Sequence, residues 1–420
     1  MSVALVAAVT AIAAVAASAA TTSSSWNYTV NPLTKFAYSA KPAAGFPAPS
    51  VCEATFGLAC YTPSEIRTGY SIPDSATGAG QTIVIVDAYG SPTIQQDLQT
   101  FDAAMGLPDP TLNIYYPGGK PTFNPQQHHQ EASWAEETSL DVEWSHAIAP
   151  EATIDLVIAA NNGGDVLNNA QSWAIDHHLG NVMSLSFGIP EGAISGNNGN
   201  NGQQAQAHDG YVAAKAANMT VFASAGDAGG NNGYSFLNAG YPASDPLVTG
   251  VGGTNLFLAD DGSYENETVW NDSDPSLCPF GCTDGVFGAT GGAPSLLYPG
   301  RDVADVGYNA SVYTAVLVYM SIPSIDPGFY FFGGTSEGAP QWAGIVADAD
   351  QAAGHAIGYI NDKLAAIGSN PAEYAADFHD VTVGQDGLNG PGTSAGVGRD
   401  DPTGLGSPIV SNLIPDLIAP

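Results

Sequence analysis

The feature that most constrains the fold of this chain is an alternation of short apolar runs with longer helical patterns. Residues 81–90 (QTIVIVDAYG) favour a buried strand ending in turn residues, and residues 91–106 favour a helix with Pro92 near its first position. The further strand candidates are 152–160, 182–188, 219–226 and 247–253, and helical patterns occupy 133–148, 165–178 and 204–217. Because parallel strands are joined by helical crossovers, this order predicts an α/β domain with a mostly parallel central sheet and helices on both faces.

One serine stands where such a fold can present a nucleophile. The stretch FFGGTSEGAPQWAGIVADA (331–349) delivers Ser336 from a turn of small residues to the start of an alanine-rich run that favours a buried helix. The free N–H groups at a helix start favour developing negative charge. A serine hydroxyl is a weak nucleophile without a general base, so another part of the chain has to supply one.

The charge balance indicates the conditions under which this base has to work. The chain has 41 Asp and Glu but only 8 Lys and Arg, a net charge of −33, while just 12% of its residues are charged. Basic residues are therefore scarce rather than acidic ones abundant, and in acid the chain avoids the repulsion between positive charges that unfolds proteins. We interpret this as adaptation to an acidic medium, with a generally acidic protein as the alternative. The lack of a basic patch excludes nucleic acid as a partner.

Histidine is the usual base for serine, and the chain has eight histidines. None lies in a His-Gly-Thr-His sequence of the subtilisin type, and an imidazole with a pKa of about 6.5 is protonated in acid. The helix predicted at 133–148 offers carboxylates instead. Glu137 and Asp141 are four residues apart and share a face, whereas Glu136 and Glu143 point elsewhere. A buried Glu–Asp pair would share a proton and provide a base below neutral pH, although an isolated pair of this spacing is usually a solvated acidic face.

A third candidate, Asp227, follows the predicted strand in VFASAGDAGG (221–230). On its own this aspartate is best interpreted as a turn residue, with a metal ligand or a catalytic acid as the alternatives.

Taken together, these stretches resemble the sedolisin family, serine-carboxyl peptidases with a subtilisin-like fold that act in acid. The family's Glu-x-x-x-Asp pair followed by Ala-Pro matches EETSLDVEWSHAIAP, its Ala-Gly-Asp-x-Gly matches AGDAG, and its Gly-Thr-Ser-x-x-x-Pro matches GTSEGAP. The resemblance runs from CYTPSEIRTGYSI near residue 60 to TGLGSP (403–408), so it implies a peptidase domain at 61–420 that acts on proteins or peptides.

The resemblance also implies roles for individual residues. Ser336 would be the nucleophile, Glu137 its base, Asp141 the partner that orients Glu137, and a protonated Asp227 a donor to the oxyanion. Asp87, at the end of the first strand, would extend this network, with a purely structural role as the alternative. The chain departs from the family at Phe187, where members often carry tryptophan.

The Gly/Asp-rich segment 378–408 resembles the calcium site of the same family. The resemblance implies one Ca²⁺ bound by the side chains of Asp380 and Asp400 and by backbone carbonyls of Val381, Gly396 and Gly398. Hard oxygen ligands on a flexible loop suit this ion. A solvated Asp/Gly loop remains the alternative.

The N-terminal residues favour export. Residues 1–20 are apolar and end in small residues, as in a signal peptide, although no positive charge precedes them and their length would also suit a membrane anchor. Residues 21–60 form a linker and N-terminal extension too short for the large prodomain usual in the family, so we expect a mature form or folding without that help. We expect a secreted monomer in an acidic environment.

The four cysteines form two close pairs, Cys52 with Cys60 and Cys278 with Cys282. Export favours two local disulfides among the three possible connectivities, with a zinc site as a weaker alternative. Two rival functions stay open: a subtilisin-type hydrolase with a histidine base, and an inactive secreted binding protein with the same fold.

Overall fold

The computed structural model describes residues 31–32, 35–40, 46–125, 129–195, 202–277, 288–323 and 325–419. The predictions for residues 1–20 and for Cys278 and Cys282 lie outside these residues. No helix in the described ranges combines the length and the apolar character needed to cross a membrane.

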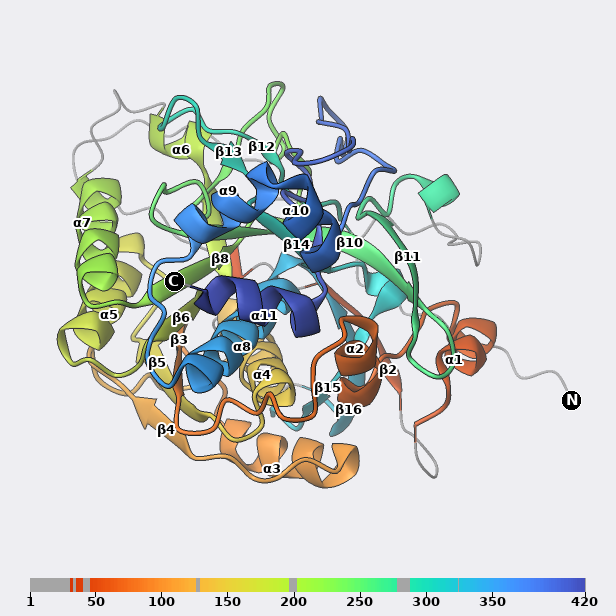
Figure 1. Cartoon of the computed structure of the whole chain (residues 1–420). Coiled ribbons are helices and arrows are strands. Elements are labelled where there is room, and N and C mark those ends of the chain that lie inside the picture. Colours follow the sequence, from red (N-terminus) through yellow and green to blue (C-terminus); the bar gives the residue numbers. More distant parts are fainter. Residues whose placement is uncertain are drawn as a thin grey trace, which may run out of the picture.

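An eight-stranded sheet forms the centre of the domain (Figure 1). Its order is β11 (Tyr264–Val269), β10 (Thr249–Leu258), β8 (Thr220–Ser224), β6 (Val182–Leu185), β3 (Thr82–Ala88), β5 (Thr153–Ala159) and β4 (Leu112–Tyr115), and β14 (Val306–Asn309) also pairs with β10. All of these pairings are parallel except that of β10 with β11. The predicted α/β fold with a mostly parallel sheet is therefore confirmed.

Helices cover both faces of this sheet, as predicted. One face carries α3 (Ile94–Met105), α4 (His129–Ile148), α8 (Thr335–Ala353) and α11 (Val410–Ile418), and the other carries α5 (Gly164–Asp176) and α7 (Gly202–Ala216). Alternate side chains of each strand enter the two cores: Ile83 and Ile85 face α4 and α8, whereas Val84 and Val86 face α5 and α7. Asp87 continues the first of these rows, so it faces α4.

Smaller elements surround this framework. A three-stranded sheet joins β1 (Asn31–Pro32), β7 (Phe187–Pro190) and β9 (Gly240–Tyr241), and a second joins β15 (Val316–Met320), β16 (Gly328–Gly333) and β2 (Lys35–Ala40). The pairs are β12 (Ala293–Pro294) with β13 (Asp302–Val303) and β17 (Phe378–His379) with β18 (Ser407–Pro408). The remaining helices are α1 (Pro49–Phe56), α2 (Pro63–Gly69), α6 (Glu191–Ser195), α9 (Asn361–Ser369), α10 (Pro371–Asp377) and two 3₁₀ turns, Pro275–Leu277 and Val312–Thr314.

The boundaries differ from the sequence-based expectations at several points. The strand expected at 182–188 is two strands, β6 and β7, interrupted at Ser186. The strand expected at 247–253 continues to Leu258 as β10, and α4 begins four residues before the expected start. The edge strand β4 was missed because its four residues are only half-buried and form no apolar run.

Candidate active site

The turn that presents Ser336 depends on two glycines between β16 and α8. Gly334 has φ = 122°, a conformation that L side chains rarely adopt. A Cβ atom on Gly333 would lie 2.6 Å from the carbonyl oxygen of Ala310 and 2.8 Å from the amide nitrogen of Val312. The two glycines therefore allow β16 to turn sharply against residues 310–312, so that α8 starts at Thr335 and Ser336 lies in its first turn.

Pro340 frees the carbonyl group of Ser336 from the helix. Proline has no N–H, so no bond can form from residue 340 back to the carbonyl of Ser336 in α8. The hydroxyl of Ser186 approaches this carbonyl oxygen at 3.3 Å, and the Ser336 hydroxyl approaches the carbonyl oxygen of Ser186 at 3.4 Å. Ser186, at the interruption between β6 and β7, thus contacts Ser336 from the sheet side.

The predicted carboxylate pair lies on the face of α4 that packs against α8. Glu137 and Asp141 are both fully buried. Glu137 hydrogen-bonds the side chain of Ser336, and Asp141 accepts a 2.8 Å hydrogen bond from the hydroxyl of Ser186. The solvated acidic face that the spacing left open is therefore excluded.

Burial is the main influence on the protonation of these carboxyls. Burial raises the pKa of Glu137 well above its ordinary value, and the charges of Asp141, Asp87 and Asp227 raise it further, while the Ser336 hydrogen bond lowers it. Burial also raises the pKa of Asp141, with a further rise from Asp87, and it raises the pKa of Asp87 to about 7. Burial and the neighbouring carboxyls thus favour the protonated form of each of these groups.

Asp227 lies on the loop after β8, beside Thr335, the residue before Ser336. Its Oδ1 atom accepts hydrogen bonds from the backbone N–H of Thr335 at 2.9 Å and from the Thr335 hydroxyl at 2.8 Å. The same hydroxyl oxygen accepts a bond from the Gly226 N–H at 3.0 Å. These bonds hold the Asp227 carboxyl, on the loop after β8, beside the first turn of α8.

Two supporting residues were not predicted from the sequence. Ser186 bridges Asp141 and Ser336, and Thr335 positions Asp227. The Thr-Ser order in the nucleophile turn was a usable signal for Thr335, but nothing local distinguishes Ser186 from the other serine of SLSFG. Phe187, noted as a departure from the family, packs against Trp134 of α4 with ring centroids 6.0 Å apart.

Five of the described histidines contact groups other than Ser336. His146 faces Asp102 at 3.2 Å, His208 contacts Asp245 at 2.8 Å, and His379 stacks on Tyr264 with centroids 3.6 Å apart. His177 and His355 approach backbone carbonyls at the surface. None of these contacts involves Ser336, whereas Glu137 hydrogen-bonds its side chain.

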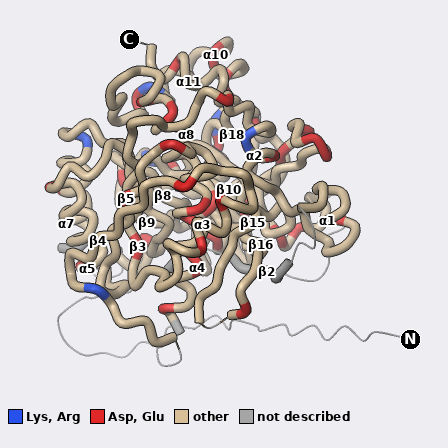
Figure 2. The backbone as a smooth tube through the Cα atoms, turned by 90° about the horizontal axis from the view of Figure 1, so that it is seen from below, with Lys and Arg blue, Asp and Glu red and all other residues tan. Residues whose placement is uncertain are grey.

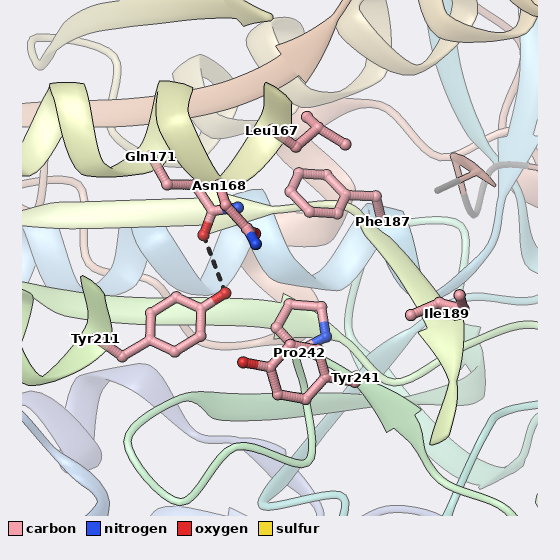
Figure 3. A pocket seen from close by; sticks show the side chains of 8 residues that line it. All are labelled: Leu167, Asn168, Gln171, Phe187, Ile189, Tyr211, Tyr241 and Pro242. Carbon is pink, nitrogen blue, oxygen red and sulfur yellow. Dashed lines mark hydrogen bonds between the residues drawn. The ribbon is translucent and has the colours of Figure 1, made fainter. Parts of the chain in front are cut away.

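The described part of the chain has two hollows that involve neighbours of the candidate site residues. A cavity of about 150 Å³ is lined mainly by apolar side chains, including Tyr89, Tyr116 and Ile158, and Ile158 stands opposite Asp87 in the pairing of β3 with β5. A cavity of roughly this size accommodates one aromatic ring. Figure 3 shows the second, smaller hollow, where Phe187 lies beside Leu167 and the Tyr211 hydroxyl donates a 2.9 Å bond to Gln171.

The residues expected to hold calcium lie together in the C-terminal loop. The N–H of Gly398 bonds to both carboxylate oxygens of Asp380 at 3.0 and 3.2 Å, and the N–H of Gly396 bonds to Asp400 at 3.0 Å. Burial raises the pKa of Asp400, and the charge of Asp380 adds to the rise, so the two carboxyls are neighbours. Val381 is buried next to Asp380. Two close carboxylates with adjoining backbone fit a Ca²⁺ ion. The described side chains contain no group of three or more His, Cys, Asp or Glu that could hold a metal, so carbonyl oxygens would have to complete the site.

A disulfide joins Cys52 of α1 to Cys60, as one of the expected pairings requires. The bond closes a loop with a sequence separation of 8 residues and ties α1 to the start of the domain.

Comparisons with known proteins found similar chains. No protein-family model matches the chain. The chain is 31% identical to kumamolisin from Bacillus sp. (strain MN-32) over 386 residues, covering 85% of this chain and 64% of kumamolisin. It is 29% identical to sedolisin from Pseudomonas sp. (strain 101) over 368 residues, covering 84% of this chain and 60% of that protein. The chain thus spans less than two thirds of the length of these relatives.

A solved structure shares the fold over nearly its whole length. Pseudomonas sedolisin, a serine-carboxyl proteinase complexed with two molecules of pseudo-iodotyrostatin, superposes with a TM-score of 0.71 at 28% identity. The match covers 85% of this chain and 98% of that structure.

Proposed function

This chain belongs to the sedolisin family, and from that premise we propose that it is a secreted serine-carboxyl peptidase that hydrolyses peptide bonds of proteins in acid. The observation that carries the proposal is the convergence on Ser336 of two acidic groups from different elements. Glu137 of α4 bonds its side chain, and Asp227 is held beside the first turn of its helix by Thr335.

The proposed reaction begins when the Ser336 hydroxyl attacks the carbonyl carbon of a peptide bond. Glu137 takes the hydroxyl proton, because it is the carboxyl that bonds this side chain. Asp141 lies one helical turn along the same face, so it shares a proton with Glu137 and keeps it oriented. Glu137 then returns the proton to the leaving amine, and a water molecule hydrolyses the acyl-enzyme by the same route in reverse.

The oxyanion that forms in this step needs hydrogen-bond donors. The backbone N–H of Ser336 is the proposed donor from the first turn of α8, because the N–H of Thr335 bonds to Asp227 and that of Glu337 bonds to the carbonyl of Gly334. Asp227 donates only while its carboxyl carries a proton, so the proposed mechanism requires acid. This requirement and the shortage of basic residues are independent arguments for the same pH range.

The charge distribution and the disulfide support the proposed location. Figure 2 shows few blue Lys and Arg positions among many red acidic ones, so in acid the folded chain would carry little positive charge. Disulfides such as Cys52–Cys60 persist mainly in oxidising compartments outside the cytosol. Membrane anchoring through residues 1–20 remains a variant of this proposal.

The proposal includes one structural Ca²⁺ in the C-terminal loop, held by the side chains of Asp380 and Asp400. The ion would neutralise these two carboxylates and fix the backbone of residues 396–400 against them. We assign it no part in the reaction.

A pH–rate profile on an acid-denatured protein substrate tests the proposed function. We expect an optimum well below pH 7 in the full chain and background turnover in Ser336→Ala at every pH. An optimum above pH 7 would favour a histidine base, and turnover unchanged in Ser336→Ala would exclude Ser336 as the nucleophile. A folded chain without any turnover would favour the inactive binding protein.

A further inference from the structure

The larger cavity lies at the carboxyl ends of three neighbouring strands of the central sheet. Tyr89 directly follows β3, Tyr116 directly follows β4, and Ile158 is the next-to-last residue of β5. The described lining contains none of the residues proposed for catalysis. Ligands of open α/β sheets usually bind outside this edge of the sheet, so the cavity is in a favourable place for a ligand.

The turn after β3 provides a fixed wall of the cavity. Tyr89 has φ = 58° and Gly90 has φ = 71°, and a bulky side chain rarely adopts this left-handed conformation. The Tyr89 hydroxyl bonds to Asn162 at 3.2 Å, and a Cβ atom on Gly90 would lie 3.0 Å from the Cδ1 atom of Ile158. The turn therefore packs directly against the lining, and residues held in such conformations cluster at ligand sites.

The size and the lining of the cavity suit an aromatic ring. Its volume is about 150 Å³, and its apolar lining includes Ile94, Ile114, Phe123 and Leu156. An apolar cavity of about 150 Å³ holds one benzene ring.

A single cation lies beside this lining. The Nζ atom of Lys120 is 5.3 Å from the centroid of the Tyr116 ring, and both residues line the cavity. An ammonium group is attracted to the face of an aromatic ring, so this contact holds the positive charge next to the cavity.

Lys120 differs from the other basic residues whose side chains the structure describes. Each of the others contacts a carboxylate or a backbone carbonyl oxygen: Arg67, Lys215, Arg301, Lys363 and Arg399. Lys120 makes neither a salt bridge nor a hydrogen bond with any residue of the described ranges. In a chain with 41 Asp and Glu and only 8 Lys and Arg, a cation without an acidic partner is unusual. Its charge is therefore available to an anion from outside the chain.

From this juxtaposition we propose that the cavity binds an aromatic carboxylate, with its ring against the apolar lining and its carboxylate on the Lys120 ammonium. Two kinds of ligand share this chemistry. One is a free aromatic acid, and the other is the carboxyl end of a peptide whose last residue is phenylalanine or tyrosine. In both, a short aliphatic spacer separates the ring from the charge, as the cavity and Lys120 require.

Titration of the purified full chain with two probes at about pH 5.5, where such carboxylic acids are ionised, tests the inference. The probes are phenylpropionate and acetyl-phenylalanine, each with its neutral amide as the control, followed by ligand-observed NMR and calorimetry. We expect an acid to bind with a Kd of about 1 mM or tighter, and its amide to bind about threefold more weakly or worse. Binding of phenylpropionate alone would assign the site to free acids, and binding of acetyl-phenylalanine would assign it to peptide ends.

Two lysines that both lie over tyrosine rings provide matched variants. Lys215 stands 3.6 Å from the centroid of the Tyr359 ring, but it is outside the described lining and pairs with an aspartate. Lys120→Gln should weaken binding of the acids about three- to fivefold, to the level of the amides, and Lys120→Arg should keep it. Lys215→Gln removes the same charge and should change nothing. Ile114→Phe should abolish binding because the larger side chain fills the cavity, with thermal unfolding as the control for folding in every variant.

The outcomes separate this inference from the proposed function. Acids and amides that bind equally, or a Lys215→Gln effect as large as that of Lys120→Gln, would overturn the site. Competitive inhibition of peptide hydrolysis that is unchanged in Lys120→Gln would overturn it as well, because the probe would then occupy the active site. A chain without peptidase activity that still binds the acids through Lys120 would support the site and overturn only the proposed function.

Discussion

Replacement of Asp227 by asparagine and by alanine separates the two tasks that the structure gives this residue. Its Oδ1 atom accepts two hydrogen bonds from Thr335, and its second oxygen is the proposed donor to the oxyanion. Asparagine keeps an oxygen for the two Thr335 bonds and supplies an N–H donor in place of the protonated oxygen. Alanine removes both functions.

The two variants should differ in stability and in rate. In Asp227→Ala the buried Thr335 N–H and hydroxyl lose their acceptor, which costs about 1–3 kcal/mol of stability, whereas Asp227→Asn should stay close to the wild type. Loss of one oxyanion donor typically costs about 3–4 kcal/mol of transition-state stabilisation, so we expect Asp227→Ala to lose about 10²–10³-fold in kcat. Asp227→Asn should retain more activity than Asp227→Ala at the pH optimum.

The pH profile gives the sharper test. Wild-type activity should fall as pH rises because Asp227 loses the proton that it donates, whereas an asparagine amide donates at every pH, so this fall should move to higher pH in Asp227→Asn. The charge of Asp227 also raises the pKa of Glu137. Asp227 carries no charge in the acid range where it donates, so the asparagine should leave the acid side of the profile close to that of the wild type.

The assay is kcat/KM on a quenched-fluorescence peptide from pH 2 to 8, with thermal unfolding at each pH as the control for folding. An Asp227→Asn profile that is uniformly lower but unchanged in shape would refute the role of Asp227 as a protonated donor. Equal activity of the alanine and asparagine variants would refute it as well.

Three further predictions concern Glu137, Glu337 and the calcium loop. Glu137→Gln keeps the shape of the side chain but cannot take the Ser336 proton, so kcat should fall about 10²–10⁴-fold in single-turnover assays while thermal unfolding stays at or above the wild-type temperature. Burial raises the pKa of Glu337 well above its ordinary value. The contribution of this carboxyl to stability is therefore full below about pH 4.3 and is lost as the pH rises. Urea unfolding should show Glu337→Gln about 1–3 kcal/mol more stable than the wild type at pH 7 and equal to it at pH 3. A chelator should lower the unfolding temperature of the wild type at pH 5 but not that of Asp400→Asn, and a wild type that ignores the chelator would contradict the calcium proposal.

Local pattern was sufficient for the parts of this protein that depend on local spacing. Glu137 and Asp141 could be placed on one face of a helix because helix geometry brings residues four apart together. The apolar runs at β3, β5 and β8 were recognisable because strands buried on both faces consist of continuous apolar residues. The glycines before Ser336 could be recognised as a turn because few other residues tolerate its conformation.

Distances between remote segments were decided by the tertiary structure alone. The contacts of Ser186 with Asp141 and Ser336 join three elements that no local pattern connects, so Ser186 was not predicted. The full burial of Glu137 and Asp141 shows that they are not on a solvated face, and this burial depends on which helix packs against α4. The pairing of residues 31–40 with β7 and β16 was equally unpredictable, because strand partners are chosen by contacts between distant parts of the chain. The sequence alone thus determined which chemical groups this protein has and their local geometry, and only the tertiary structure determined which of them meet.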